Sequence, residues 1–240
     1  MGAAFADIDN DGYLDLLVAN YVGGSNLYIN NGNGTFQKSY NFPQKDSFSF
    51  CPSFGDFDND GDLDLLITDN KIGNSFYLNN GTGQFNEVTE KYANLKLLGV
   101  RGKASTFVDI DNDGDLDLFI ANWAEENKLF KNTLNDKNWL KINATELQRE
   151  AYGAKIKVLS ESDKKLVAYR EVKSATGACA QEGGTQHIGL NSTLTYDVIV
   201  TFPDGSEVVA KTISPGQTLE INKGRNGGHK NIAAKSHNSS

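Results

Sequence analysis

The chain has 240 residues, of which 38% are apolar and 10% aromatic, and its formal net charge at pH 7 is −8. This length suits one or two domains with a buried core, and the acidic balance argues against a nucleic-acid partner, whose phosphates require a basic surface. No apolar run approaches the length of a membrane span, so we expect no transmembrane segment. The 24 glycines against a single methionine favour a turn-rich, all-β protein.

An acidic nine-residue loop occurs three times in the first half of the sequence. The copies begin at Asp7, Asp56 and Asp109, and each has aspartates at its first, third, fifth and ninth places and glycine at its sixth. Carboxylates packed this closely repel one another unless a hard divalent cation, which prefers oxygen ligands, neutralises them. The glycine permits the sharp turn, with φ > 0, that folds the chain around such an ion. The pattern therefore predicts about three Ca²⁺ ions.

The predicted ligands are the side chains at the first, third, fifth and ninth places and, by analogy with other calcium loops, the backbone carbonyl at the seventh. They are Asp7, Asp9, Asp11, Tyr13 and Asp15 in the first copy, Asp56, Asp58, Asp60, Asp62 and Asp64 in the second, and Asp109, Asp111, Asp113, Asp115 and Asp117 in the third. The side chain at the seventh place is expected to matter little. The twelfth place, a bidentate glutamate in an EF-hand, holds Val18, Ile67 and Ile120, which excludes that motif.

A strand pattern follows each loop. The apolar runs at residues 14–19, 63–68 and 116–121 are typical of buried strands. With the strands expected around them, each copy forms a unit of four short strands in about fifty residues, the size of one propeller blade, and such units bury their faces by packing against neighbours.

Aromatic residues recur with the loops and are expected in the core. Tyr28, Tyr77 and Phe130 each lie 21 residues after the first aspartate of their copy. The first two copies continue into a Gly-x-Gly-x-Phe turn that ends at Phe36 and Phe85, whereas the third copy lacks this turn. The third unit therefore departs from the other two at its end.

The whole pattern, Phe-x-Asp-x-Asp-x-Asp-Gly-x-x-Asp-Leu, begins at Phe5, Phe54 and Phe107. It resembles the FG-GAP repeats, also catalogued as VCBS repeats, of integrin-type β-propellers. The resemblance implies that each loop binds calcium at a blade edge through the aspartates named above. We expect three four-stranded blades over residues 1–137, divided at about 1–48, 49–100 and 101–137.

A second domain is predicted from about residue 138, where the acidic loops stop. Strand-like segments follow at residues 154–159, 165–172, 195–202 and 218–221. The landmarks Asn-Trp-Leu at 138–140, Gly-Ala-Lys at 153–155, Arg-Glu-Val at 170–172, Gln-His-Ile-Gly-Leu at 186–190 and Phe-Pro-Asp-Gly at 202–205 resemble the ASPIC/UnbV domain over residues 138–222. That family usually has Trp in place of Phe202 and Gly in place of Asn191. We expect a small β-sandwich or barrel-like domain, followed by a disordered tail at 223–240.

Catalysis is not expected. His187 is the only histidine within the two domains, and a lone histidine beside Ile188 is more often structural. Every close pair of carboxylates lies in a metal loop, where ionised ligands are required. Cys51 and Cys179 leave two alternatives open, a cross-domain disulfide or two thiols.

The sequence therefore predicts a calcium-stabilised binding or adhesion module that works outside the cell or on its surface, where millimolar calcium fills modest sites. Because all ligands of a site lie on one local loop, the ions are expected to be structural, and the ligand, protein or carbohydrate, would be recognised elsewhere. The alternatives are a non-catalytic accessory region of a larger secreted enzyme and a surface scaffold. Three repeats are too few to close a propeller, so we expect upstream blades and an export signal in a longer chain.

Overall fold

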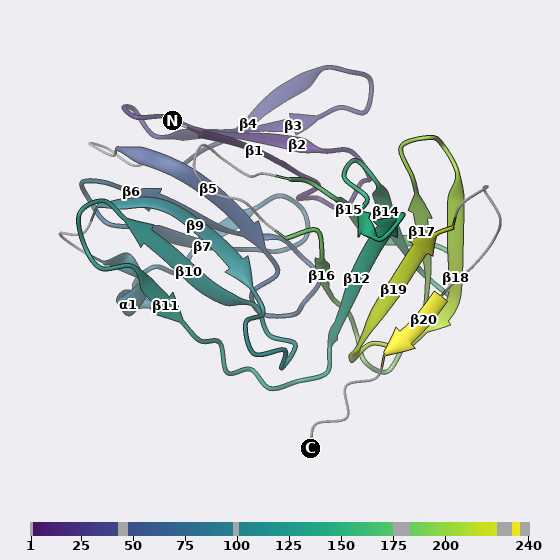
Figure 1. The fold of residues 1–240 in the computed structure, drawn as a ribbon. Helices are drawn as coiled ribbons and strands as arrows, with labels where there is room; N and C mark the ends of the chain where they lie inside the picture. Colours follow the sequence, from purple (N-terminus) through teal and green to yellow (C-terminus); the bar gives the residue numbers. More distant parts are fainter. Residues whose placement is uncertain (1, 43–47, 98–100, 175–182, 225–231, 236–240) are drawn as a thin grey trace.

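The computed structural model describes residues 2–42, 48–97, 101–174, 183–224 and 232–235. Within these residues the protein is all-β except for one helical turn, α1 (Ala93–Lys96). Five small, mostly antiparallel sheets form a β-propeller arrangement (Figure 1). The all-β expectation is confirmed.

The first sheet has four antiparallel strands in sequential order. They are β1 (Gly2–Ala6), β2 (Asp15–Ala19), β3 (Ser25–Asn30) and β4 (Phe36–Phe42). The first acidic loop joins β1 to β2, and alternation along β2 places Leu17 and Ala19 in the core. The loop is thus held between two paired strands.

The second sheet repeats this order. Its strands are β5 (Ser49–Gly55), β6 (Asp64–Asp69), β7 (Ser75–Asn79) and β8 (Phe85–Glu87). All six residues of β6 are buried, as expected for a strand covered on both faces. The turn α1 follows β8 and has no counterpart in the sequence prediction.

The third sheet has three strands among the described residues, where four were expected. They are β9 (Gly102–Val108), β10 (Asp117–Asn122) and β11 (Lys128–Phe130). The physical reason is the missing Gly-x-Gly-x-Phe turn after β11: without glycines that adopt φ > 0, the chain does not reverse into a fourth strand. It runs on instead toward the C-terminal part.

Burial of the recurrent aromatics differs between the repeats. Tyr77 and Phe85 are buried and pack edge-on against Phe42, which confirms their core role in the second repeat. Phe36, the counterpart of Phe85 in the first repeat, is 42% exposed, so its predicted core role is wrong. The first sheet packs with the second through a shared cluster that includes Leu17, Phe42, Tyr77 and Phe85.

The first strands of the three repeats, β1, β5 and β9, lie next to one another (Figure 1). The Ser53 hydroxyl on β5 lies 2.7 Å from the backbone oxygen of Ser105 on β9. A Cβ atom at Gly55 would come within 2.6 Å of the Phe107 ring, so this position accommodates only glycine. Because each acidic loop leaves the end of such a strand, the three loops gather at one end of the repeat region.

The C-terminal part consists of two sheets around one core. The first sheet has the order β15, β14, β17, β18, and the second has the order β13, β12, β19, β20 with β16 also paired to β12. The strands are β12 (Trp139–Glu146), β13 (Arg149–Glu150), β14 (Lys155–Ser160), β15 (Leu166–Glu171), β16 (Gln186–Gly189), β17 (Tyr196–Thr201), β18 (Glu207–Ile213), β19 (Gln217–Lys223) and β20 (Ile232–Lys235). The four segments predicted as strands therefore form β14, β15, β17 and β19.

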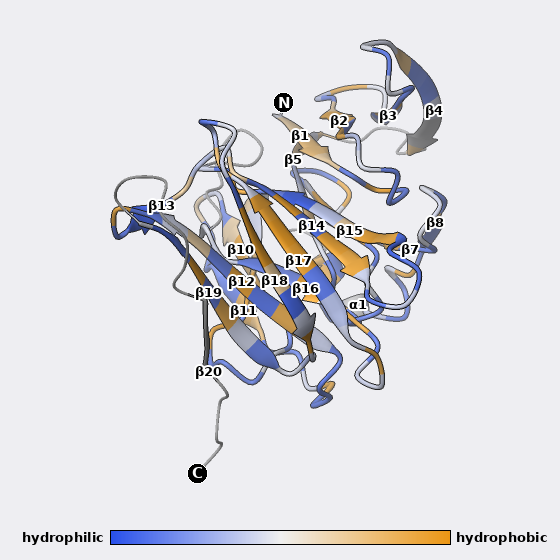
Figure 2. Cartoon of the chain, turned by 90° about the vertical axis from the view of Figure 1, so that its right-hand side faces the viewer, coloured by the Kyte–Doolittle hydropathy of each residue, from blue (hydrophilic) through white to orange (hydrophobic). Residues whose placement is uncertain are grey.

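The two C-terminal sheets share a single hydrophobic cluster that includes Leu140, Ile156, Val198 and Leu219, each 0% exposed. Figure 2 shows apolar stretches on β15 and β17 of the first of these sheets. Strands β12 and β19 pair in parallel. Parallel strands cannot be joined by a hairpin, so local patterns in the sequence do not predict this pair.

The predicted disordered tail is corrected in part. Strand β19 extends to Lys223, and β20, at residues 232–235, pairs with it antiparallel in the register Leu219↔Ala234. Residues 225–231 and 236–240 lie outside the described residues.

Cys51 lies buried on β5, and Cys179 falls outside the described residues, so the pairing of the two cysteines stays a prediction. No helix in the described part of the chain is long and apolar enough to cross a membrane.

Candidate metal centres

The three acidic loops share one backbone geometry. In each, the sixth-place glycine adopts a positive φ, as predicted, and its N–H donates to the first-place carboxylate. The φ angles are 93°, 100° and 99° at Gly12, Gly61 and Gly114, and the hydrogen bonds to Asp7, Asp56 and Asp109 measure 3.0, 3.0 and 2.8 Å. The turn thus points the first carboxylate back into the loop.

The ninth-place aspartate joins its loop to the third strand of the same sheet or, in the third repeat, to Asn132, two residues after β11. In the first repeat, one oxygen of Asp15 accepts the N–H of Ile8 at 3.0 Å and the other accepts the N–H of Asn30 at 2.8 Å. The second and third repeats form the same pairs at Asp64 and Asp117. All three of these aspartates are buried, so this place holds the loop shape as well as contributing charge.

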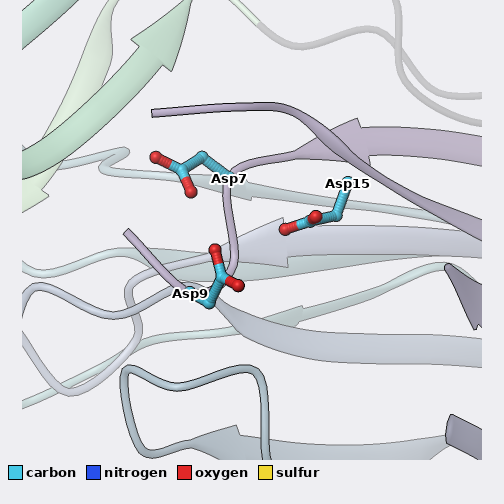
Figure 3. Close-up of side chains that lie close together, drawn as sticks. All are labelled: Asp7, Asp9 and Asp15. Atoms are coloured by element: carbon cyan, nitrogen blue, oxygen red, sulfur yellow. The ribbon is translucent and has the colours of Figure 1, made fainter. Parts of the chain in front are cut away.

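Three carboxylates converge in each loop, with one oxygen from each lying within 4.8 Å of the others. The groups are Asp7, Asp9 and Asp15; Asp56, Asp58 and Asp60; and Asp109, Asp111 and Asp117. Figure 3 shows the first of these groups around its loop. The first and third places join every group, whereas Asp11, Asp64 and Asp113 lie outside the groups. The backbone carbonyls at the seventh places stay a prediction.

Buried oxygens in these groups have no hydrogen-bond donor among the described residues. They are Oδ1 of Asp9, Asp56, Asp58 and Asp109. A buried carboxylate oxygen without a donor is costly. Because every group has at least one such oxygen, and hard divalent cations are bound by carboxylates, the donor set fits such an ion.

Burial also shifts the pKa of these carboxyl groups upward. Desolvation raises the pKa of Asp7 and Asp56 to about 7, that of Asp15 to about 6 and that of Asp64 to about 9. Without a cation, part of the set therefore carries protons near neutral pH. A cation that binds must displace them, so its affinity depends on pH.

The seventh-place side chains do matter in two repeats, contrary to expectation. The fourth-place asparagine of one loop donates to the seventh-place aspartate of the next: Asn10 to Asp62 at 2.9 Å and Asn59 to Asp115 at 3.0 Å. The asparagines adopt φ of 56° and 58°, a left-handed conformation that asparagine tolerates. The first repeat has Tyr13 at the seventh place and so lacks this carboxylate.

A second asparagine links the loops across repeats. Asn79, two residues after Tyr77, donates to the backbone oxygen of Ile8 at 2.7 Å, and Asn132 donates to that of Phe57 at 2.8 Å. The sequence signal was present, because an asparagine follows each recurrent aromatic at this spacing. Its long-range partner could not be read from the repeat alone.

Two lysines that the repeat pattern does not predict contact the third loop from outside it. Lys131 forms an ion pair with Asp111 and lies 3.6 Å from Asp113, and Lys141 forms an ion pair with Asp109. The residues that correspond to Lys131 in the other repeats are Ile29 and Leu78. The third group of carboxylates is therefore partly neutralised by the protein's own cations.

The C-terminal part completes the surroundings of the second loop. The Gly189 N–H on β16 donates to Asp56 at 2.6 Å, and Arg170 on β15, 6% exposed, donates from Nη2 to the Gly61 oxygen at 3.3 Å. The expectation that each site is built by one local loop is therefore incomplete. A residue more than a hundred positions away positions a carboxylate of the second loop.

His187 contacts the same loop, with its Nε2 atom 2.8 Å from the side-chain oxygen of Asn59. Burial, together with the charges of Lys141 and Arg170, lowers the pKa of His187 to about 3, so the imidazole is neutral. The side-chain nitrogen of Asn59 donates to Asp115, which fixes its oxygen toward His187.

Family models match both halves of the chain. The FG-GAP-like repeat matches residues 7–67 and 56–120, two overlapping stretches that contain all three acidic loops. The ASPIC and UnbV model matches residues 144–227. A comparison with curated proteins gave no match. The chain is an FG-GAP-like repeat region followed by an ASPIC and UnbV domain.

Proposed function

We propose that this chain is a non-catalytic, calcium-stabilised binding module that works outside the cell, and that its three repeat sheets are propeller blades attached to a C-terminal β-sandwich domain. The observation that carries the calcium assignment is the convergence of three carboxylates within 4.8 Å in every loop. Both family models support an extracellular module of the propeller type. Ca²⁺ accepts irregular sets of oxygen ligands, whereas the smaller Mg²⁺ requires a near-ideal octahedron, so these loops favour Ca²⁺.

The ions have a structural role in this proposal. Each loop joins the first two strands of a sheet, and its ninth-place aspartate also holds the third strand. A cation that neutralises the loop therefore stabilises three strands at once. Recognition of a protein or carbohydrate partner would use other surfaces, and the adhesion role follows from the family resemblance.

Thermal unfolding with Ca²⁺, with Mg²⁺ and with a chelator tests the assignment. A ligand that binds the folded state alone stabilises it by RT ln(1 + [L]/Kd), so millimolar Ca²⁺ should raise the Tm more than Mg²⁺ does. A triple variant at the third places, Asp9→Asn, Asp58→Asn and Asp111→Asn, should lose the Ca²⁺-dependent rise. Asp163→Asn, an exposed carboxylate on a C-terminal turn, is the matched control. Equal melting curves with Ca²⁺ and with chelator would contradict the proposal.

A further inference from the structure

A cavity of about 280 Å³ lies between the repeat region and the C-terminal domain. The repeats contribute the rings of Phe5, Phe54 and Phe107 and the first-place aspartates to its wall. The C-terminal domain contributes Arg170 from β15 and His187 from β16. Its volume is at the small end of ligand pockets, roughly 300–1,000 Å³, and suits one small molecule.

The Oδ2 atoms of the wall aspartates already have partners. Asp56 accepts two backbone N–H groups, from Gly61 and Gly189, and Asp109 pairs with Lys141. Arg170 lies near Asp7 and Asp56 and is attracted by both. With Glu171 and Lys173 counted, the wall has four acidic and three basic residues, so the protein's own cations balance all but one of the negative charges. With the cations of the proposed function bound in the loops, the wall is positive and disfavours a cationic ligand.

Besides Oδ1 of Asp56 and Asp109, which belong to the carboxylate groups of the loops, two polar atoms of the wall residues have no partner among the described residues, and they differ in character. Arg170 donates through its two terminal nitrogens, to the oxygens of Tyr169 at 3.0 Å and Gly61 at 3.3 Å, but its Nε–H is buried without an acceptor. An unpaired donor on a buried charged group is costly, and an oxyanion is the acceptor that suits a guanidinium.

The second unpartnered atom is Nδ1 of His187. Its Nε2 faces the side-chain oxygen of Asn59, so Nε2 carries the proton of the neutral ring. Nδ1 is then a hydrogen-bond acceptor, and the partner that suits it is a hydroxyl group. The two orphan atoms thus require different groups on one ligand.

The apolar part of the wall is aromatic. Phe107 is 8% exposed and Phe5 is 46% exposed, so the cavity has an aromatic interior and reaches solvent beside Phe5. Flat aromatic faces pack against the C–H faces of a ring or short carbon chain. We propose that this cavity binds a small hydroxycarboxylic acid, such as a sugar acid, with its carboxylate on Arg170, a hydroxyl on His187 and its carbon skeleton against Phe5 and Phe107.

Three probes of matched shape separate these requirements in titration calorimetry of the full chain: glucuronate, with carboxylate and hydroxyls; glucose, with hydroxyls alone; and cyclohexanecarboxylate, with the carboxylate alone. Glucuronate should bind at least about tenfold more tightly than either of the others, the factor that a lost charged hydrogen bond of about 1.5 kcal/mol gives. Equal affinities for the three probes, or no binding of glucuronate, would overturn the proposal.

Variants assign the contacts. Arg170→Lys keeps the charge but loses Nε–H and should weaken glucuronate binding about tenfold or more, whereas Arg149→Lys on exposed β13 should not. Phe5→Ala should also weaken binding, with Phe36→Ala, an equally exposed phenylalanine on β4, as its control. If Arg170→Lys does not fold, Phe5→Ala decides, because its exposed side chain is not needed for the core. Unchanged glucuronate affinity in a folded cavity variant would refute the assignment.

Titrations in Ca²⁺ and in chelator distinguish a failure of this proposal from a failure of the proposed function. The Ca²⁺-dependent Tm rise is scored in the same samples without a probe. Glucuronate that fails to bind a chain stabilised by Ca²⁺ rejects the cavity ligand and leaves the metal assignment standing.

Discussion

At the residue scale, the most consequential feature is the burial of carboxylates that a cation would neutralise. The carboxyl groups of Asp7 and Asp56 have pKa values raised to about 7, mainly by desolvation, against an ordinary value of 3.8. Without a cation, the folded protein is therefore more stable when these groups are protonated than when they are ionised. The ionised forms are needed by the cation.

This difference predicts opposite pH responses of the two states. In chelator, the folded protein binds more protons than the unfolded chain between about pH 4 and 7, so its stability is highest at low pH and is lost as the pH rises through about 7. We expect the Tm in chelator to rise as the pH falls from 8 to 5.5. The increase in Tm that Ca²⁺ causes should become smaller as the pH falls over the same range, because protons compete with Ca²⁺ for the carboxylates.

Thermal melts at several pH values measure both effects. Asp56→Asn, which removes one of the shifted groups, should flatten the pH dependence in chelator. If the Tm in chelator instead decreases as the pH is lowered from 8 to 5.5, these carboxylates are not the titrating groups.

The position of Lys131 predicts that the three loops bind Ca²⁺ with unequal affinity. Its ammonium group lies against Asp111 and Asp113, where the second repeat has Leu78, so it must leave before those carboxylates can bind a cation. Lys131→Leu should raise the Ca²⁺ affinity of the third loop a few-fold, and the rise should be smaller at high salt.

Calorimetry of a background in which Asp9→Asn and Asp58→Asn disable the other loops isolates this site. Lys128→Leu, on the same strand β11 but paired with Glu126, is the matched control. Equal Ca²⁺ affinities with and without Lys131 would mean that its ion pair does not compete with the metal.

At the scale of elements, asparagine side chains connect one repeat with the next. Asn79 is 6% exposed, and its amide donates to the backbone oxygens of Ile8 in the preceding loop and Leu63 in its own. Replacement leaves two buried carbonyls without a donor. Neighbouring sheets are thus joined by hydrogen bonds as well as by their shared core.

Asn79→Ala should therefore destabilise the fold by about 1–3 kcal/mol, which lowers the Tm by roughly 2–10 °C. Differential scanning calorimetry measures the change. Asn80→Ala alters the adjacent, exposed asparagine, whose side chain serves only the local turn at Thr82, and should cost less. If both variants melt alike, the inter-repeat bonds contribute nothing measurable.

The third sheet shows how one local departure changes an element. Its copy of the repeat keeps the acidic loop and the aromatic Phe130 but lacks the two glycines of the following turn. The sheet stops at three strands, and Asn132 still donates to Phe57 of the preceding repeat. The loop and the fourth strand are thus separable parts of a repeat.

At the scale of the whole molecule, the C-terminal domain covers the end of the repeat region where the acidic loops gather. Contact is close at Gly189, where a Cβ atom would come within 2.4 Å of the Asn59 backbone and 2.5 Å of the Asp56 carboxylate. The side chains of Arg170 and Lys141 bring positive charge to the same surface. The acidic and basic halves are complementary there.

Gly189→Ala should separate β16 from the second loop. We expect a loss of about 1–3 kcal/mol of stability, as for overpacked cores, together with weaker Ca²⁺ binding, since Asp56 loses the Gly189 N–H. Hydrogen exchange around Asn59 and calorimetric Ca²⁺ titration provide the two readouts. Gly183→Ala, at a glycine with open space around it, is the control and should leave both unchanged. A Gly189→Ala protein with normal exchange and Ca²⁺ affinity would contradict the role of this contact.

The sequence by itself determined the features that depend on neighbours along the chain. Aspartates at alternate places around Gly12, Gly61 and Gly114 predicted the loops, and apolar runs predicted β2, β6 and β10. Spacing of a few residues fixes which side chains share a loop or a strand face, whatever the rest of the fold does.

Tertiary structure alone decided which distant groups meet these loops. The pairing of Asn59 with Asp115, the approach of Gly189 to Asp56 and the ion pair of Lys141 with Asp109 join residues between 32 and 133 positions apart. Such contacts depend on the way whole sheets pack, and no local pattern encodes that packing. The sequence therefore specified where a cation could bind, whereas the packing of the two domains decided what surrounds it and created the cavity between them.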